Sequence, residues 1–217
     1  MLRLKVTELR EKLIYESSLV EKMIYNAIYG LLETDTQKLQ QALEYETLIN
    51  QTEMEIEELC INLIALYQPE AKDLRTIIMI LKINNDFERM GDQAVNIIYA
   101  ANFLIERPSL KPLISISAMA KETIHMLQKA LNAYINEDVV QSKEICVFDD
   151  VIDGYRDQIT RELITYMLSD PQNIERSLKL LKITENLERI ADLCTNVAEN
   201  TIFIKEGRVI KHNTPST

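Results

Sequence analysis

Hydrophobic residues recur every three or four positions over long stretches of this chain, which is the pattern of amphipathic helices. Polar side chains fill the positions between them, and alternating runs of β-branched residues are few. Two apolar seams of this kind are Ile83, Phe87, Met90, Ala94, Ile97, Ala101 and Leu104, and Ile183, Leu187, Ile190, Cys194, Val197, Thr201 and Ile204. The pattern predicts an all-α fold.

Breaks in the pattern divide the chain into six long helices. Their predicted ranges are about 2–32, 36–67, 69–106, 113–136, 139–168 and 171–206, with Thr34 or Asp35, Asp138 and Asp170 as N-caps of the second, fifth and sixth. The segment RPSLKP supplies two prolines between the third and fourth helices and is the best candidate boundary. We therefore expect a three-helix bundle over residues 1–107, a second over 112–206 and a loose tail over 207–217.

The two halves also repeat in sequence. The segments MILKINNDFERMGDQAVNI and KLLKITENLERIADLCTNV lie 100 residues apart and share Leu, Lys, Ile, Glu, Arg, Asp and Asn at matching places. A repeat of this length is too long for a solenoid unit. It predicts two tandem three-helix bundles related by a pseudo-twofold axis.

Acidic side chains recur inside this repeat at intervals close to one helical turn. Glu88, Asp92 and Asn96 follow one another by four residues in the first half, and Glu188, Asp192 and Asn196 do so in the second. On a helical wheel these stripes lie opposite the apolar seams, so they are expected to face out of each bundle. Exposed acids paired with Arg89 and Arg189 would be the plain alternative, but recurrence at one place in both halves argues against chance.

The middle helix of each half carries an acidic line of its own. The first-half line is Glu46, Asn50, Glu53 and Glu57, and the second-half line is Asp149, Asp153 and Asp157. If neighbouring helices bring these lines to the stripes, carboxylates converge and repel unless a cation lies between them. A set of oxygen ligands suits hard cations such as Mg²⁺, Mn²⁺, Ca²⁺ or iron.

Charge and composition narrow the function further. The 217 residues carry a net charge of −10, which disfavours nonspecific binding to nucleic acid or to an anionic membrane. No signal peptide or membrane span is recognisable, so a cytoplasmic location is expected. The three cysteines are far apart, which argues against structural zinc or a disulfide framework; Cys60 and Cys194 are expected to be packed core residues.

A di-metal enzyme of the ferritin type is the sharper catalytic alternative. It requires Glu-x-x-His on two helices, whereas the chain has the motif once, as Glu122 and His125. We therefore expect His125 to be structural. No nucleophile elbow or Gly-rich phosphate loop is present in the sequence. The sequence predicts no enzymatic activity.

At DFERMGDQAVNI and NLERIADLCTNV the chain resembles the PhoU family of phosphate-uptake regulators, and the segments LYQPEAKDLR and RELITYMLSDP extend the likeness. The resemblance implies two three-helix bundles with multinuclear metal clusters at two surface sites, iron in some members, with Mg, Mn, Ca, Zn or Ni as alternatives. It assigns Glu88, Asp92 and Asn96 to the first site with Glu46 and Asn50, and Glu188, Asp192 and Asn196 to the second with Asp149 and Asp153. Because Asn50 stands where an Asp is common, Glu53 or Glu57 is an alternative ligand of the first site.

The same resemblance implies negative control of the phosphate-starvation response. The implied partners are the phosphate-specific ABC transporter and a sensor histidine kinase, with membrane association only through these partners, and a homodimer is expected. Two other readings stay open at this point, a carboxylate-rich metal-dependent enzyme and a metal-free helical scaffold. Metal content separates the scaffold from the other two.

Overall fold

Long helices connected by short turns make up nearly all of the computed structural model, which describes residues 1–208. The elements are α1 (Leu2–Leu32), α2 (Thr36–Tyr67), α3 (Ala71–Ile105), α4 (Ile114–Asn136), α5 (Val139–Ser169), the 3₁₀ turn η1 (Pro171–Asn173) and α6 (Ile174–Glu206). The described residues contain no strand, and the all-α prediction is confirmed.

Capping side chains fix where the middle helix of each half begins. The Asp35 carboxylate accepts from the backbone N–H of Gln37 at 2.9 Å, and the Asp138 carboxylate accepts from that of Val140 at 2.9 Å. Each cap satisfies amides that have no partner within the helix. Of the two capping candidates for α2, the structure selects Asp35.

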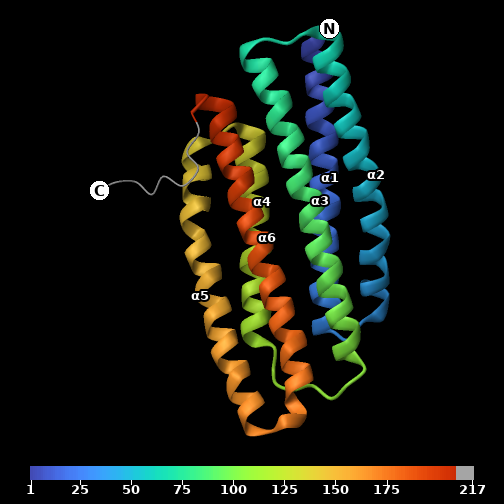
Figure 1. The fold of residues 1–217 in the computed structure, drawn as a ribbon, viewed down its shortest axis with the longest axis vertical. Coiled ribbons are helices and arrows are strands. Elements are labelled where there is room, and N and C mark those ends of the chain that lie inside the picture. Colours follow the sequence, from blue (N-terminus) through green and yellow to red (C-terminus); the bar gives the residue numbers. More distant parts are fainter. Residues whose placement is uncertain (209–217) are drawn as a thin grey trace, which may run out of the picture.

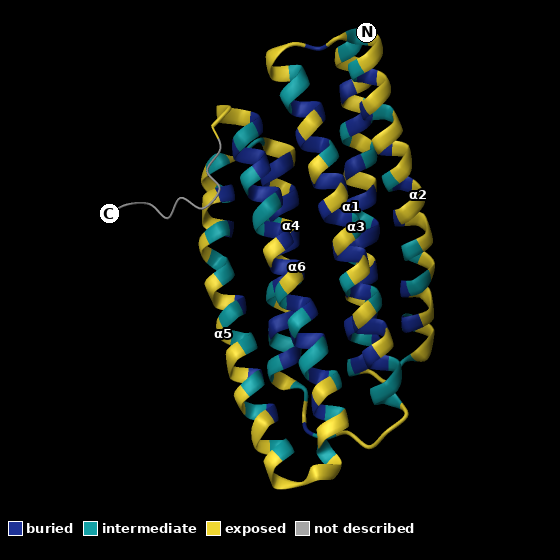
Figure 2. Cartoon of the chain, in the orientation of Figure 1, coloured by how far each residue is buried: buried dark blue, intermediate teal, exposed yellow. Residues whose placement is uncertain are grey.

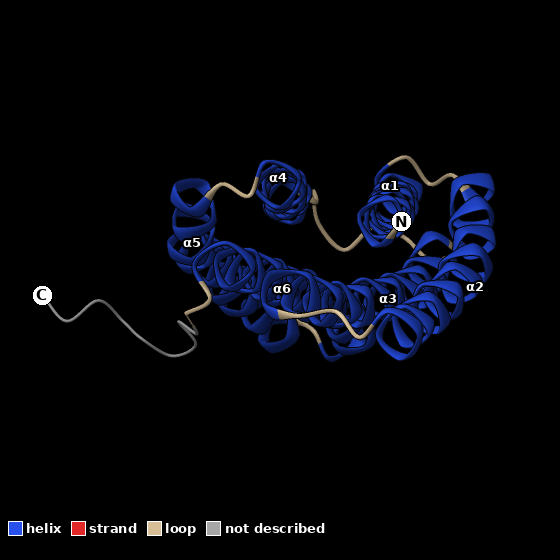
Figure 3. Cartoon of the chain, turned by 90° about the horizontal axis from the view of Figure 1, so that it is seen from above, coloured by secondary structure: helices blue, strands red, loops and turns tan. Residues whose placement is uncertain are grey.

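Figure 1 shows α1, α2 and α3 as one bundle and α4, α5 and α6 as a second, with α3 and α6 side by side at the centre. Seen from above, α2, α3, α6 and α5 form one curved layer, and α1 and α4 pack on the same face of it (Figure 3). The chain runs in opposite directions along α3 and α6 (Figure 1). The predicted pair of pseudo-twofold-related bundles is therefore confirmed, and the two bundles share the α3–α6 contact.

The predicted seams form the core of both bundles, and buried positions line the inward faces of the helices in Figure 2. Every seam residue of α6 is buried, and so is every seam residue of α3 except Leu104, which is partly exposed at the end of its helix. Three-four spacing places these side chains on one face of each helix, so their burial follows from the sequence pattern.

Polar contacts also hold the two bundles together. The Arg10 guanidinium on α1 donates to the Glu137 carboxylate at 2.9 Å, and Gln128 on α4 donates to Glu21 at 2.6 Å. Arg75 on α3 donates through Nε to the backbone carbonyl of Ile204 on α6 at 3.1 Å. These contacts fix the relative position of the halves in addition to the apolar packing between α3 and α6.

Small differences from the prediction occur at helix ends. Pro69 lies before α3 rather than in its first turn, because Gln68 and Ala71 adopt left-handed φ angles of 44° and 45° and the helix starts only at Ala71. Residues 171–173 form η1 ahead of α6, with the Asp170 carboxylate accepting from the Gln172 amide. The predicted tail over 207–217 lies outside the described residues from residue 209 onward. Among the described helices, none is long and apolar enough to cross a membrane.

Candidate functional site

The acidic stripe of α3 lies where the wheel places it. Asp92 and Asn96 are exposed, and Glu88 is half-buried on the same side of the helix. Burial and the neighbouring carboxylates of Asp92 and Glu53 raise the pKa of Glu88, and Arg89 opposes this only in part. Glu88 therefore lies toward Glu53 of α2, while Asp92 and Asn96 face solvent.

On α2, Glu53 is the acid that meets the α3 stripe. Burial, followed by the carboxylate of Glu57, raises the pKa of Glu53, and Glu53 in turn acts on Glu88. Glu46 is half-buried and Asn50 is exposed, and neither makes an ion pair or a side-chain hydrogen bond to another described residue. Of the predicted middle-helix positions in this half, the structure brings Glu53 to Glu88.

A third acid comes from α1 and was not predicted. Glu16 has 0% of its surface exposed, and neither of its carboxylate oxygens has a hydrogen-bond partner within residues 1–208. Burial, with the carboxylates of Glu53 and Glu88, raises the pKa of Glu16 to about 9. One signal for it was available: Glu16 occupies a place in the apolar seam of α1, between Leu13 and Val20.

The second half brings together the acids that the repeat predicts. Asp149 and Asp153 of α5 lie beside Glu188 and Asp192 of α6. Burial, then the charges of Asp192, Asp153 and Glu188, raises the pKa of Asp149 to about 6. Burial and the same neighbours raise the pKa of Asp192. This cluster differs from the first because a guanidinium lies within it.

Arg156 of α5 supplies that positive charge. Its Nη1 donates to Glu188 at 2.7 Å and lies 2.9 Å from an oxygen of Asp153, and its Nη2 lies 3.1 Å from Asp157. Charge-assisted bonds of this length are the stronger kind in proteins. The second cluster therefore has an internal cation, and its repulsion is already reduced.

The two asparagines of the stripes are both engaged in protein contacts. Asn96 donates from Nδ2 to the backbone carbonyl of Asp92 at 3.0 Å, within its own helix. Asn196 donates at 3.5 Å to the carboxylate of Asp86 on α3, so it links the two bundles. Each amide keeps its oxygen for a further contact, which is the atom that a hard cation would use.

The donor set of both clusters fits a hard cation, because every acid in them offers carboxylate oxygen. The buried, unpartnered oxygens of Glu16 are the direct sign in the first half. Over residues 1–208 no group of three or more His, Cys, Asp or Glu side chains is already arranged to hold a metal ion. Glu53 and Glu88 are partly exposed, so their side chains have room to turn toward an ion.

A polar pocket of about 500 Å³ lies between the clusters, where α3 meets α6. Arg89 and Arg189 line it from corresponding places in the two motifs, together with Gln93, Asp192 and Asn196. Arg89 lies 3.6 Å from Asp86, and Arg189 lowers the pKa of Asp192 against the larger effect of its burial. The arginines thus offset part of the acidic charge at the centre of the molecule.

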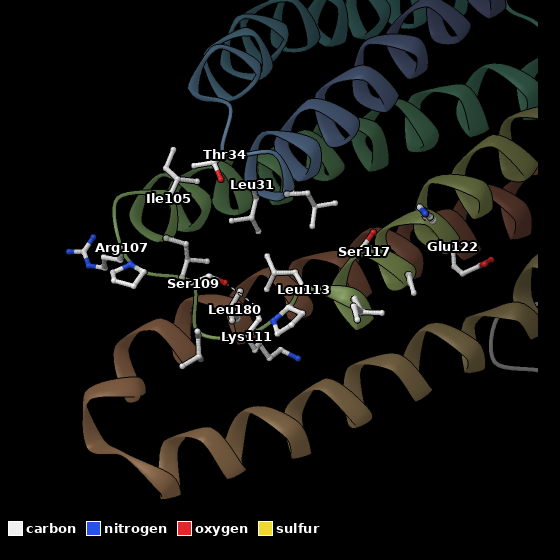
Figure 4. Close-up of a pocket in the computed structure, with 18 residues that line it drawn as sticks. Leu31, Thr34, Ile105, Arg107, Ser109, Lys111, Leu113, Ser117, Glu122 and Leu180 are labelled. Atoms are coloured by element: carbon white, nitrogen blue, oxygen red, sulfur yellow. Dashed lines mark hydrogen bonds between the residues drawn. The ribbon is translucent and has the colours of Figure 1, made fainter.

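A larger pocket of about 820 Å³ lies at the C-terminal end of α1, beside the linker between the bundles. Leu31, Leu113 and Leu180 line it along with Lys111, as Figure 4 shows. The Lys111 side chain is only 1% exposed and forms an ion pair with Glu162 of α5. This pocket is remote from both acid clusters, and its buried ammonium is committed to the fold.

The remaining candidates fall outside the clusters. Cys60 and Cys194 are fully buried, as predicted for packed residues. His125 is 54% exposed on α4, and its Nδ1 lies 3.8 Å from the Glu122 carboxylate. A helix-surface position explains this, because the seam of α4 runs through Thr123 and Met126 on either side of it.

Comparison with known proteins places this architecture in a family. The PhoU domain model matches residues 16–101 and again residues 116–201, one match in each bundle. A phosphate-specific transport system accessory protein PhoU homolog from Aquifex aeolicus is 39% identical over 208 residues, covering 96% of this chain and 94% of the relative. A PhoU homolog 2 from Thermotoga maritima is 32% identical, over 97% of this chain and 90% of the relative.

Two solved structures of PhoU proteins have the same fold as this chain. The crystal structure of PhoU from Pseudomonas aeruginosa superposes with a TM-score of 0.93 at 32% identity, covering 96% of this chain and all of that one (100%). The phosphate transport system regulatory protein PhoU from Streptococcus pneumoniae gives a TM-score of 0.89 at 28% identity, covering 96% of this chain and 99% of the other.

Proposed function

The chain belongs to the PhoU family, and we propose that it is a metal-binding accessory protein of phosphate transport that regulates uptake rather than catalysing a reaction. The observation that carries the proposal is the match to accessory proteins of phosphate-specific transport over 96% of the chain, across both bundles. The relatives are named as accessory proteins of phosphate-specific transport, and the Streptococcus pneumoniae structure is named as a regulatory protein.

Metal binding is the part of this role that the acid clusters support. Glu88 and Asp92 with Glu53 would hold an ion in the first half, and Asp149, Asp153, Glu188 and Asp192 would do so in the second. Hard divalent cations and iron fit these oxygen ligands. A bound ion would join the middle and last helices of each bundle and would neutralise acids that otherwise repel.

The finer role is an adaptor that links the phosphate ABC transporter to a sensor histidine kinase and holds the starvation response off. Support for a protein partner comes from the surface of α2, which leaves Met54, Ile61 and Leu66 exposed by 57% or more. Apolar side chains in this number on one helix suit a contact surface. A homodimer belongs to the same proposal.

Deletion in a phosphate-replete host tests the regulatory role. Alkaline phosphatase is expected to rise on deletion and to fall again when the wild-type chain is restored. A variant with Glu88, Asp92, Glu188 and Asp192 changed to Ala is expected to restore control poorly. The matched variant changes four exposed acids outside the clusters, Glu11, Glu44, Glu58 and Glu144, to Ala and should restore control fully. Unchanged phosphatase on deletion would remove the regulatory proposal.

A further inference from the structure

The two halves share a register that lets their sites be compared residue by residue. The amide of Asp35 donates to the Gly30 carbonyl at 2.8 Å, and the amide of Asp138 donates to the Ala133 carbonyl at 2.9 Å. These equivalent turns set an offset of 103 residues between α1–α2 and α4–α5. The buried positions of α1 from Leu13 onward, with the exception of Leu19, recur in α4 at this offset, which confirms the register.

In this register three positions of the acid clusters differ in charge. Asn50 corresponds to Asp153, and the other two differences lie at Glu16 and Glu53. Glu16 corresponds to Met119, which is equally buried but apolar. Glu53 corresponds to Arg156, which binds Glu188 at 2.7 Å. The partner on the last helix is the same in both halves, Glu88 or Glu188. The first half thus has three carboxylates where the second has a thioether, a guanidinium and one carboxylate.

Within residues 1–208 no basic side chain forms an ion pair with Glu16, Glu53 or Glu88. Among the described residues, the cation that acts on Glu88 is the neighbouring Arg89, which is exposed and lies near Asp86. Lys12, one turn before Glu16 on α1, is held by Glu55 at 2.6 Å on the outer side. Buried carboxylates without a partner are rare in folded proteins, because removing the charge from water is costly. Neither carboxylate oxygen of Glu16 has a hydrogen-bond partner within residues 1–208, so both are free to bind an added cation.

We propose that Glu16 is a metal ligand, and that the first half binds a hard divalent cation with one carboxylate from each of its three helices, Glu16, Glu53 and Glu88. This inference rests on the metal binding proposed above and extends it to a helix outside the repeated motif. It also makes the two halves unequal. Arg156 occupies the second half as a built-in cation, so the first half binds its ion more tightly.

Manganese titration of the full chain tests this assignment. Protein stripped with chelator is titrated with Mn²⁺, and free Mn²⁺ is followed by electron paramagnetic resonance. The wild-type chain is expected to show a tighter and a weaker class of sites. Glu16→Gln, which keeps the shape of the side chain, should weaken the tighter class at least tenfold and leave the weaker class unchanged. Glu16→Met, which copies the second half, should do the same and guards against a packing artefact.

Two further variants separate the outcomes. Glu11→Gln removes one exposed carboxylate from the same helix and should bind as the wild type does. Asp192→Asn should weaken only the second class. If Glu88→Gln weakens the tighter class and both Glu16 variants, folded by circular dichroism, bind normally, Glu16 is not a ligand although the metal proposal stands. If the wild-type chain binds no Mn²⁺, Fe²⁺ or Mg²⁺, the metal proposal and this inference both fail.

Discussion

Glu16→Gln is expected to stabilise the metal-free protein, although the substitution lies in the core of the first bundle. Burial raises the pKa of Glu16 in the folded state to about 9, from an ordinary value of 4.5. The folded chain therefore keeps Glu16 protonated at neutral pH, while the unfolded chain releases that proton. Because the folded-state pKa is raised, the contribution of Glu16 to stability is most favourable below pH 4.5 and is lost as the pH rises toward 9.

The size of the effect follows from the two pKa values. Each pH unit between them costs the wild-type chain about 1.4 kcal/mol, so the loss at pH 7 is about 3 kcal/mol. A Gln side chain does not ionise in either state and escapes this loss. Because a buried Gln and a protonated Glu both leave polar atoms unpartnered, the diagnostic quantity is the change of the stability difference with pH, rather than its absolute value.

Urea denaturation in chelator, followed by circular dichroism at pH 5, 6, 7 and 8, measures this. The difference in unfolding free energy between variant and wild type should grow in favour of the variant by about 1.4 kcal/mol per pH unit. Glu11→Gln is the control, and as an exposed substitution it should stay within about 0.5 kcal/mol of wild type. A difference that stays constant from pH 5 to 8 would refute the reasoning, since solvent would then be reaching the Glu16 carboxylate in the folded state.

Three further outcomes are expected. Arg156→Gln should destabilise the metal-free chain by about 1 kcal/mol and increase the rise in melting temperature that Mn²⁺ produces, because its partners Asp153 and Glu188 become free. Phe87→Ala, at a fully buried seam position, should cost about 3–5 kcal/mol in urea denaturation. Glu137→Gln should cost about 1 kcal/mol at pH 7. Burial, which raises the pKa of Glu137, is outweighed by the hydrogen bond and charge of Arg10 and by Lys72. The loss of unfolding free energy caused by Glu137→Gln should therefore disappear as the pH falls below the usual carboxyl range. Urea titrations of variant and wild type at pH 7 and pH 3 would show this.

Much of the fold could be predicted because it depends on local pattern. The seams through Phe87 and Leu187 form the cores of the two bundles. Asp35 and Asp138 cap the N-termini of α2 and α5, as their positions in the sequence predict. The α3–α6 contact could not be predicted, because both helices carry apolar side chains beyond their seams and the sequence does not say which neighbour covers them.

The acid clusters were predictable only where they repeat. Glu188 and Asp192 meet Asp149 and Asp153 as the spacing indicated, since both lines lie on faces that antiparallel neighbours share. Glu16 belongs to no repeat, and a helical wheel reads it as an isolated charge in an apolar seam. Only the packing of three helices brings it to Glu53 and Glu88. Arg156 was overlooked for the same reason, because its role depends on what lies opposite it.

The second bundle shows that this three-helix fold does not need a carboxylate at the position of Glu16. Met119 packs there with no exposed surface, and its neighbours form a bundle of the same register. A carboxyl in that place weakens the metal-free first bundle by about 3 kcal/mol at neutral pH, a large share of the stability of an ordinary domain. Hydrogen bonding within the described chain does not offset that loss, because both oxygens are unpartnered. A divalent cation shared with Glu53 and Glu88 would bind the folded state and prefer the ionised acid, so its binding would offset this loss.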